Sequence, residues 1–426
     1  MEVDLTNPYL RIEAVAAKDS VTGSMERISD MANRKSKPGY EYIAGINADF
    51  FDMDNGTGRP YNGSIYENQI GTKPPAGAHI VFAGKQPVID NVEFSGYVIH
   101  KGKKSVFSTV NDVRGAHKLV FYNQLNGTHT HTDTSGTEVE LQLQPDETWG
   151  FNKPITAQVV KIEQSKGNML IPKGEVVLSG NGLGAAGLSS MTEGDEVTLH
   201  LDLTFAKHSS FSIGTDISSM LGARHTLWNL DGLPYENIIL YNGVAYEVEA
   251  ANHPRTGAGY SIDGKKLIFC VADGRSTISQ GCFTKELADM LKSMGAWNGL
   301  CFDGGGSSEM WIKQLGGVVN VPSDGHERAI GNALFIVADD RPDAIPEIAT
   351  EPEIRVYPNP VINEVHIESN VPINSIEFCN ATGKRLLSDT THGRKHIVSL
   401  NRFPQGIYIL KMDTGNKIII RKLIKH

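Results

Sequence analysis

The residues best suited to chemistry in this sequence follow a short apolar run that ends at Phe302. They are one acid, three glycines, two hydroxyls and a second acid: Asp303, Gly304, Gly305, Gly306, Ser307, Ser308 and Glu309. Glycine costs conformational entropy wherever a fold holds it still, so three in a row indicate unusual backbone angles or a close approach to the backbone. A carboxylate and a glycine loop at the end of a buried strand predict an active site. A tight turn with a capping aspartate is the alternative.

A second acidic strand end lies upstream. The apolar run from Lys266 ends at Asp273-Gly-Arg275, and an amphipathic helix over Thr284–Met294 separates it from Asp303. A crossover of this kind places both aspartates at the same edge of one sheet. Arg255, in Asn252-His-Pro-Arg-Thr-Gly, adds a planar fork of donors suited to carboxylate or phosphate. We expect two carboxylates and two arginines to converge there, with salt-bridge scaffolding as the alternative.

A third candidate is a strand end near the start of the chain. An apolar run from Tyr42 leads into Asn47-Ala-Asp49, and Phe50 and Phe51 follow directly. Amide and carboxylate groups beside aromatic rings suit a sugar, because the rings pack on its apolar face and the polar groups orient its hydroxyls. An ordinary transition from strand to loop would also explain the pattern.

Two common catalytic patterns are excluded. Glu309 replaces the second glycine of a G-x-S-x-G nucleophile elbow, and no lysine follows the glycines as a Walker loop requires. A pair of carboxylates can instead cleave an acetal. Three arginines, Arg255, Arg275 and Arg328, would be superfluous for a neutral glycoside but useful for an anionic one such as a sugar phosphodiester.

Composition describes an ordinary soluble globular chain of two or three domains, with 426 residues, 40% hydrophobic and 21% charged. The net charge of -9 gives no hint of nucleic acid, and no apolar run is long enough for a transmembrane segment. Four cysteines without C-x-x-C spacing make a zinc site improbable and leave free thiols or a disulfide open. His129 and His131 could share a strand face, but we predict neither a metal nor a cofactor.

The distribution of charge and the spacing of the expected strands divide the chain into a large domain, a linker and a C-terminal tail. Residues 354–426 carry eleven Lys/Arg and five Asp/Glu, a net of +6, so the remainder carries 29 against 44, a net of -15. We expect an α+β fold: a large strand-rich domain over 1–340 with mixed sheets and few helices, a linker at 341–353 that is rich in proline and acid, and a tail of short, regularly spaced strands. That spacing is typical of a small β-sandwich.

Taken together, four motifs resemble those of the phosphodiester glycosidase family. They are Gly45-Ile-Asn-Ala-Asp-Phe-Phe, His253-Pro-Arg-Thr-Gly, Asp273-Gly-Arg and Asp303-Gly-Gly-Gly-Ser-Ser. This family includes the lysosomal uncovering enzyme, which removes N-acetylglucosamine from a phosphodiester on mannose. The resemblance covers roughly residues 1–340. The tail, from Val356-Tyr-Pro-Asn-Pro to the basic end, resembles the C-terminal sorting domain of type IX secretion in Bacteroidetes.

The resemblance implies an exported hydrolase that cleaves a glycosidic bond in a sugar-1-phosphodiester, such as one of N-acetylglucosamine, or in a related anionic glycan. Asp303 and Glu309 are the expected acid/base residues, with Asp273 next, and the division of roles among them stays open. The expected substrate-binding residues are Asn47, Asp49, Arg255, Arg275, Gly304, Gly305, Ser307, Ser308 and Arg328.

Within that set, Arg255 and Arg275 would hold the phosphate, and Asn47 and Asp49 the sugar hydroxyls. The sorting domain implies an encounter with the type IX machinery and a secreted or cell-surface location. The chain begins Met1-Glu-Val-Asp-Leu without a visible leader. Because the sorting domain implies export, we expect a signal peptide upstream of Met1 that is missing from this sequence. Two alternatives remain: a surface protein that binds glycans in the same cleft without catalysis, and a phosphoesterase that cleaves the P–O bond.

Overall fold

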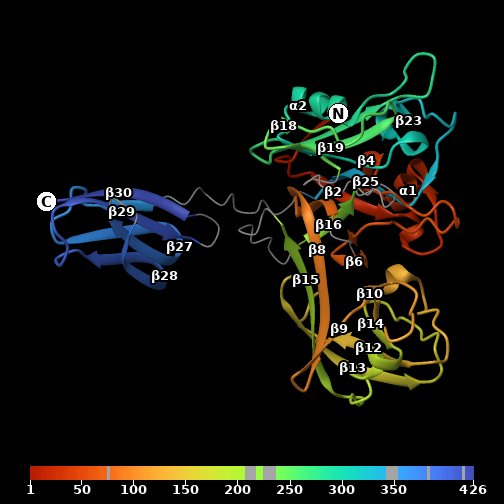
Figure 1. Ribbon diagram of the computed structural model, residues 1–426, viewed down its shortest axis with the longest axis horizontal. Coiled ribbons are helices and arrows are strands. Elements are labelled where there is room, and N and C mark those ends of the chain that lie inside the picture. Colours follow the sequence, from red (N-terminus) through yellow and green to blue (C-terminus); the bar gives the residue numbers. More distant parts are fainter. Residues whose placement is uncertain (74–76, 207–216, 224–236, 342–353, 381–383, 415–417) are drawn as a thin grey trace. The chain divides into compact units, whose positions relative to one another are not determined.

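The computed structural model describes residues 1–73, 77–206, 217–223, 237–341, 354–380, 384–414 and 418–426 (Figure 1). The described residues up to Arg341 belong to one compact unit, and those from Ile354 onward to a second. Apart from Arg341, the expected linker lies outside the described residues. Within them, no helix is long and apolar enough to cross a membrane.

One sheet of the first unit consists of antiparallel neighbours in the order β2-β25-β4-β22-β23, with helix α1 on one face. Along β25, Leu334 and Ile336 enter one hydrophobic cluster, while Phe335 and Val337 enter another beside α1. This two-residue alternation is what a strand buried on both faces requires. The elements are α1 (Ile28–Lys35), β2 (Leu10–Ala16), β4 (Tyr40–Asn47), β22 (Met310–Ile312), β23 (Gly317–Val318) and β25 (Asn332–Asp339).

A second sheet, ordered β1-β20-β19-β21-β17-β18, packs against the first. Leu300 and Phe302, which follow one another on the same face, join the cluster that both sheets share. On the other face, Leu287 and Leu291 of α2 cover the strands. The order of layers is therefore α1, sheet, sheet, α2 (Figure 1). The elements are α2 (Thr284–Ser293), β1 (Glu2–Asp4), β17 (Ile238–Tyr241), β18 (Val244–Ala245), β19 (Arg255–Tyr260), β20 (Lys266–Ala272) and β21 (Asn298–Cys301).

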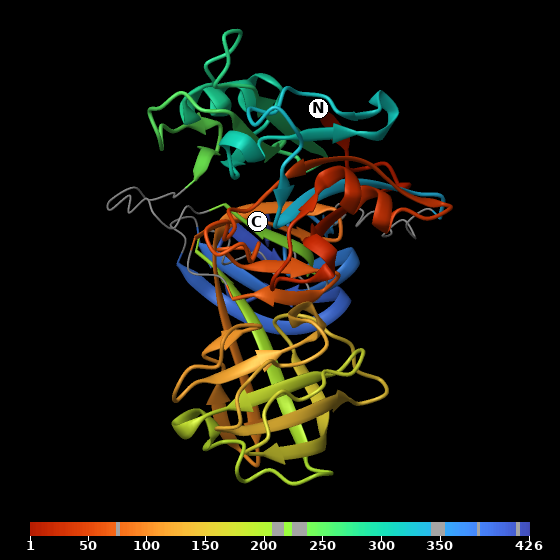
Figure 2. The same ribbon diagram turned by 90° about the vertical axis from the view of Figure 1, so that its right-hand side faces the viewer.

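The largest sheet continues from these layers into a second group of strands, through the long strands β8 and β15 (Figure 2). Its order is β10-β11-β14-β12-β13-β15-β8-β7-β16-β5-β6, with β9 paired to β8. The strands are β5 (Ser64–Tyr66), β6 (Gln69–Thr72), β7 (Gly77–Ala83), β8 (Gln86–His100), β9 (Lys103–Val106), β10 (Thr109–Val110), β11 (Leu119–Tyr122), β12 (Thr137–Leu143), β13 (Pro154–Gln164), β14 (Val176–Gly180), β15 (Glu196–Phe205) and β16 (Ile217–Gly222). A two-strand ribbon pairs β3 (Glu26–Arg27) with β24 (Ala329–Ile330).

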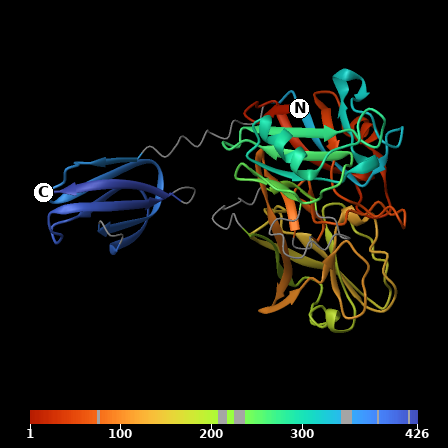
Figure 3. The ribbon, with the colours of Figure 1, turned by 45° about the horizontal axis from the view of Figure 1, so that its top comes forward.

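The second unit consists of five antiparallel strands with a hydrophobic core of its own (Figure 3). The strands are β26 (Ile354–Tyr357), β27 (Glu364–Asn380), β28 (Arg385–Ser399), β29 (Gly406–Asp413) and β30 (Ile418–Lys425). The predicted fold class is confirmed: a large strand-rich unit with two α-helices among its described residues, and a small C-terminal unit made of strands. All four cysteines are free thiols.

Candidate active site

The two acidic strand ends meet at one edge of the second sheet, as the crossover predicts. Strands β20 and β21 both pair antiparallel with β19, one on each side, and are therefore parallel to each other. Ala272 lies opposite Arg255, and Cys301 lies opposite Gly257. Asp273 and Asp303 therefore leave the sheet where β19 begins.

Asn47 joins this edge to the end of β4 in the neighbouring sheet. Its Nδ2 donates to the carbonyl of Asp303 at 2.8 Å, and its Oδ1 accepts from the hydroxyl of Thr256 at 2.7 Å and from the N–H of Glu309 at 3.1 Å. The Asp303 N–H donates in return to the carbonyl of Ala48 at 2.9 Å. Asn47 is 1% exposed, and both polar atoms of its amide already hydrogen-bond within the protein. Its role in this structure is to hold the two sheets together at Asp303.

A cavity of about 240 Å³ opens above this junction. Its lining comes from several loops and strand ends: Phe50, His253, Arg255, Arg275, Asp303, Gly304, Gly305, Gly306 and Arg328. The structure thus brings six of the predicted site residues to one cavity. We name it the Asp303 cavity.

Asp303 is the carboxylic acid in the lining of this cavity. Burial raises its pKa to about 6, against the opposing effects of a hydrogen bond from Ser307, the N–H of Gly304 at 2.8 Å, and the positive charges of Arg328 and Arg275. Desolvation therefore raises the pKa of Asp303 by more than these hydrogen bonds and positive charges lower it. A carboxyl that changes its charge near pH 6 can act as an ionised base or nucleophile at neutral pH.

Two guanidinium groups lie close to the second and third glycines of the loop, Gly305 and Gly306. A Cβ at Gly305 would lie 3.0 Å from Nη1 of Arg275, and a Cβ at Gly306 would lie 1.9 Å from Nη2 of Arg328. The close approach indicated by the sequence is therefore made by the protein's own arginines. Arg328 also donates to Asp324 at 2.7 Å and to the Ser307 hydroxyl at 3.2 Å.

Arg275 differs from the other two arginines in its freedom to bind. It is exposed, and among the described residues its guanidinium makes no hydrogen bond or ion pair, although its charge reaches Asp303. Arg255 is buried and already committed. It pairs with Glu249 at 2.5 Å and donates to the carbonyls of Ala251 at 2.9 Å and Cys282 at 3.2 Å. Arg275 is therefore the best-placed donor for an incoming anion.

The other predicted acids lie outside the cavity lining. Asp49 is buried and accepts from both the N–H and the amide of Asn62, at 3.0 and 2.6 Å. Burial, reinforced by the charge of Asp303, holds the pKa of Asp49 well above its usual range. Asp273 accepts from the amide of Asn320 and the N–H of Val321, both at 3.0 Å, and so fixes that loop.

Glu309 is not among the residues that line the cavity. It is fully buried, and its Oε1 accepts from the main-chain N–H of Arg328 at 2.6 Å. Burial raises its pKa to about 8. Its second oxygen and the hydroxyl of the neighbouring Ser308 have no hydrogen-bond partner among the described residues. The predicted acid/base assignment to Glu309 stays a prediction.

Three lining residues were missing from the predicted set: His253, Phe50 and Gly306. His253 borders the cavity with its Nε2 3.6 Å from Glu249, and Phe50 presents an aromatic ring. The signals were present, since His253 belongs to the polar run before β19 and Phe50 to the aromatic pair after Asp49. Within the described part of the chain, no group of three or more His, Cys, Asp or Glu residues gathers to hold a metal ion.

Residues 150–337 match the family model described as phosphodiester glycosidase. The chain carries a phosphodiester glycosidase domain. The matched part of this domain includes Arg255, Arg275, Asp303 and Arg328, whereas Asn47 precedes it. Residues 355–426 match the secretion system C-terminal sorting domain, which marks the protein as secreted or displayed at the cell surface.

One curated relative is similar to this chain in sequence, and two solved structures are similar to it in fold. The SPbeta prophage-derived protein YomE of Bacillus subtilis (strain 168) is 29% identical over 166 residues, which is 37% of this chain and 25% of YomE. A Burkholderia pseudomallei protein described as exported is similar with a TM-score of 0.57 and 20% identity, covering 79% of this chain and 72% of that one. A Synechocystis protein has a TM-score of 0.56 and 15% identity, covering 79% and 58%.

Two of these similarities are partial. The chain spans a quarter of YomE and little more than half of the Synechocystis protein. At such identities, the likeness to the solved structures shows the fold alone.

Proposed function

We propose that this chain hydrolyses the glycosidic bond of a sugar-1-phosphodiester, or of a related anionic glycan, in the Asp303 cavity. The observation that carries the proposal is a half-buried carboxyl that shares its cavity with Arg328 and with Arg275, whose guanidinium has no partner among the described residues. A neutral glycoside gives such cations nothing to bind, whereas a phosphodiester offers an anion matched to them. The family match supports the same class of bond.

The division of labour follows from charge. Water supplies a hydroxyl to the anomeric carbon, and the glycosidic electron pair leaves with the phosphate oxygen. A phosphate group departs as an anion, so cations nearby stabilise it without a prior proton transfer. Asp303, ionised above about pH 6, activates the water or attacks the carbon itself. Phe50 would pack on the apolar face of the sugar ring.

The four motifs that resemble the family favour a narrower substrate class, the phosphodiesters of N-acetylglucosamine. The test is release of free N-acetylglucosamine from its α-1-phosphodiester by purified protein. Asp303→Asn should lower turnover by about 10²–10⁴-fold. Asp289→Asn, on the exposed face of α2, is the matched control and should keep wild-type turnover.

The outcomes separate the proposal from its competitors. Substrate binding without release of sugar by the wild-type protein would favour a glycan-binding surface protein. Hydrolysis in oxygen-18 water should label the sugar; label in the phosphate would instead identify a phosphoesterase. Full turnover by a folded Asp303→Asn variant would overturn the assignment of Asp303.

A further inference from the structure

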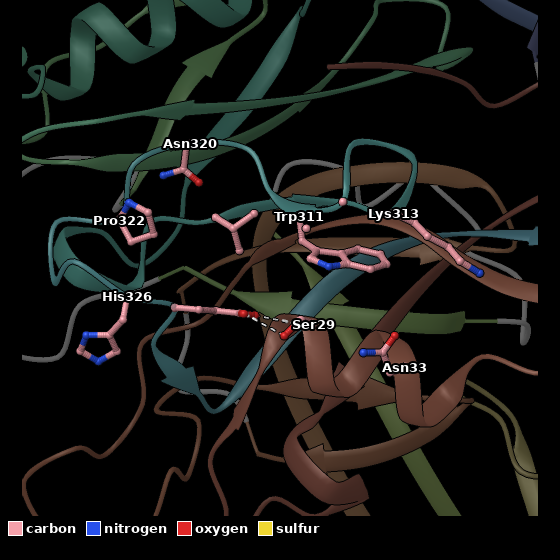
Figure 4. Close-up of a pocket in the computed structure, with 11 residues that line it drawn as sticks. Ser29, Asn33, Trp311, Lys313, Asn320, Pro322 and His326 are labelled. Atoms are coloured by element: carbon pink, nitrogen blue, oxygen red, sulfur yellow. Dashed lines mark hydrogen bonds between the residues drawn. The ribbon is translucent and has the colours of Figure 1, made fainter.

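A second and larger cavity, of about 540 Å³, lies against the first turns of α1 (Figure 4). Glu327 lines it, while the next residue, Arg328, lines the Asp303 cavity, so one segment borders both. None of the residues assigned to chemistry above lines this second space. We name it the α1 cavity.

One wall of the α1 cavity is polar and comes from the helix. Ser29 and Asn33 are four residues apart, which places them on the same helix face, opposite the buried Met31 and Ala32. The Glu327 carboxylate accepts two hydrogen bonds from Ser29, one from its main-chain N–H at 2.7 Å and one from its hydroxyl at 2.8 Å. The amide of Asn33, one turn further along, has no hydrogen-bond partner among the described residues.

The opposite wall combines apolar surface with a free donor. In Figure 4 the indole of Trp311 extends across from Ser29 and Asn33. Val318 and Pro322 add apolar surface. Trp311 is 5% exposed, so most of its ring belongs to the core. Among the described residues its indole N–H has no hydrogen-bond partner, and this N–H and the Asn33 amide can both bond to a ligand.

The charged groups of Lys313 and Glu327, in the wall of the α1 cavity, already have partners within the protein. Lys313 pairs with Glu41 at 2.8 Å, and both oxygens of Glu327 accept from Ser29. No unpaired guanidinium like that of Arg275 lines this space. An anion would therefore gain little here, in contrast to the Asp303 cavity.

We propose that the α1 cavity binds a neutral saccharide unit of a longer glycan. Its volume falls within the range of about 300–1,000 Å³ that small-molecule sites occupy. Apolar surface together with a few convergent amide and N–H groups matches a sugar ring, which has apolar C–H faces and hydroxyls at its edge. Binding here needs no turnover at Asp303, so this site and the proposed hydrolysis can fail independently.

The experiment titrates the full chain with the neutral trisaccharides chitotriose, mannotriose and cellotriose, followed by saturation-transfer NMR. At least one should bind with a dissociation constant in the millimolar range or below. Asn33→Ala should weaken that binding by about two- to tenfold, the effect of one lost hydrogen bond. Asn33 is exposed and alanine favours a helix, so this variant should fold.

Three controls make the result decisive. Asp30→Asn changes an exposed residue of α1 outside the cavity and should bind like wild type. Arg275→Ala should also keep trisaccharide binding, and inorganic phosphate should not displace the sugar. No binding of any trisaccharide, unchanged binding by Asn33→Ala, or displacement by phosphate would each overturn the proposal.

Discussion

Asp303 combines burial with nearby positive charge, and this balance sets the pH at which it works. Its pKa is raised to about 6, so the ionised form dominates only above that pH. We expect the hydrolysis rate at subsaturating substrate to rise tenfold per pH unit below about pH 6 and to level above it. A pH profile of kcat/KM checks this. A rate that falls as pH rises through 6 would mean that Asp303 works as a protonated acid.

The same raised pKa predicts a gain of stability when Asp303 loses its charge. A carboxyl whose folded pKa exceeds its unfolded value of 3.8 destabilises the fold progressively as pH rises from about 4 to 6, and fully above. Asp303→Asn removes that penalty. It should raise the free energy of unfolding by on the order of 1–3 kcal/mol at pH 7.5 and by close to zero at pH 4.

Urea unfolding at the two pH values measures this difference. An equal effect at both would mean that Asn alters packing and not charge. The variant should thus be more stable and less active, as expected where a site holds a charge at the expense of the fold.

Glu309 offers a contrast between positioning and chemistry. Its carboxylate accepts a hydrogen bond from the main-chain N–H of Arg328, and the carbonyl oxygen of an amide can do the same. We expect Glu309→Gln to keep kcat within about tenfold of wild type, and Glu309→Ala to lose more, because the buried N–H is left unpaired. Steady-state kinetics of both variants decide this. Equal and severe losses would support the acid/base role predicted from the sequence.

At the scale of elements, the glycine loop lies directly against the arginines, and a substitution at Gly306 tests the importance of this contact. A Cβ there would lie 1.9 Å from the Arg328 guanidinium and 2.3 Å from the Asp324 carboxylate. Both are the far ends of flexible side chains, which can move at little cost to the fold. The free energy of unfolding of Gly306→Ala should therefore lie within about 1 kcal/mol of the wild-type value. Its KM should nevertheless rise, because the added methyl group displaces Arg328. Gly115→Ala, where a Cβ meets nothing closer than 3.5 Å, is the control.

Local pattern predicted the elements that carry this loop. The periodicity over Thr284–Met294 identified α2, and the apolar runs that end at Asp273 and Asp303 identified the strands on either side, because those signals lie within a few residues. Their arrangement followed from the helix between the two strands, which is of a length that fits a crossover.

The local pattern could not predict which polar groups are already bonded to other groups within the folded protein. Asn47 bonds to Asp303 across 256 positions of sequence, so its role as a clamp is invisible to any local window. Arg255 looked as free as Arg275 until the structure placed Glu249 against it. The α1 cavity likewise unites residues 29 and 33 with residues 311–327 and has no contiguous motif.

At the scale of the molecule, the sorting unit should be separable from the chemistry. It has its own hydrophobic core and carries none of the residues that line the Asp303 cavity. Deletion of residues 354–426 should leave hydrolysis near the wild-type rate and abolish export. Activity of the purified truncated protein and its location in cells measure both. A soluble, folded truncation without activity would contradict this independence.

The pairing of β25 bears on how the domain can be cut. The matched family segment begins at residue 150, but β25 lies between β2 and β4, which both precede that point. A fragment that starts at residue 150 would expose both edges of β25 and would also lack the Asn47 clamp. Exposed strand edges recruit other chains, so such a fragment should aggregate rather than fold. For this protein, the boundary of sequence similarity and the boundary of the foldable unit are two different places.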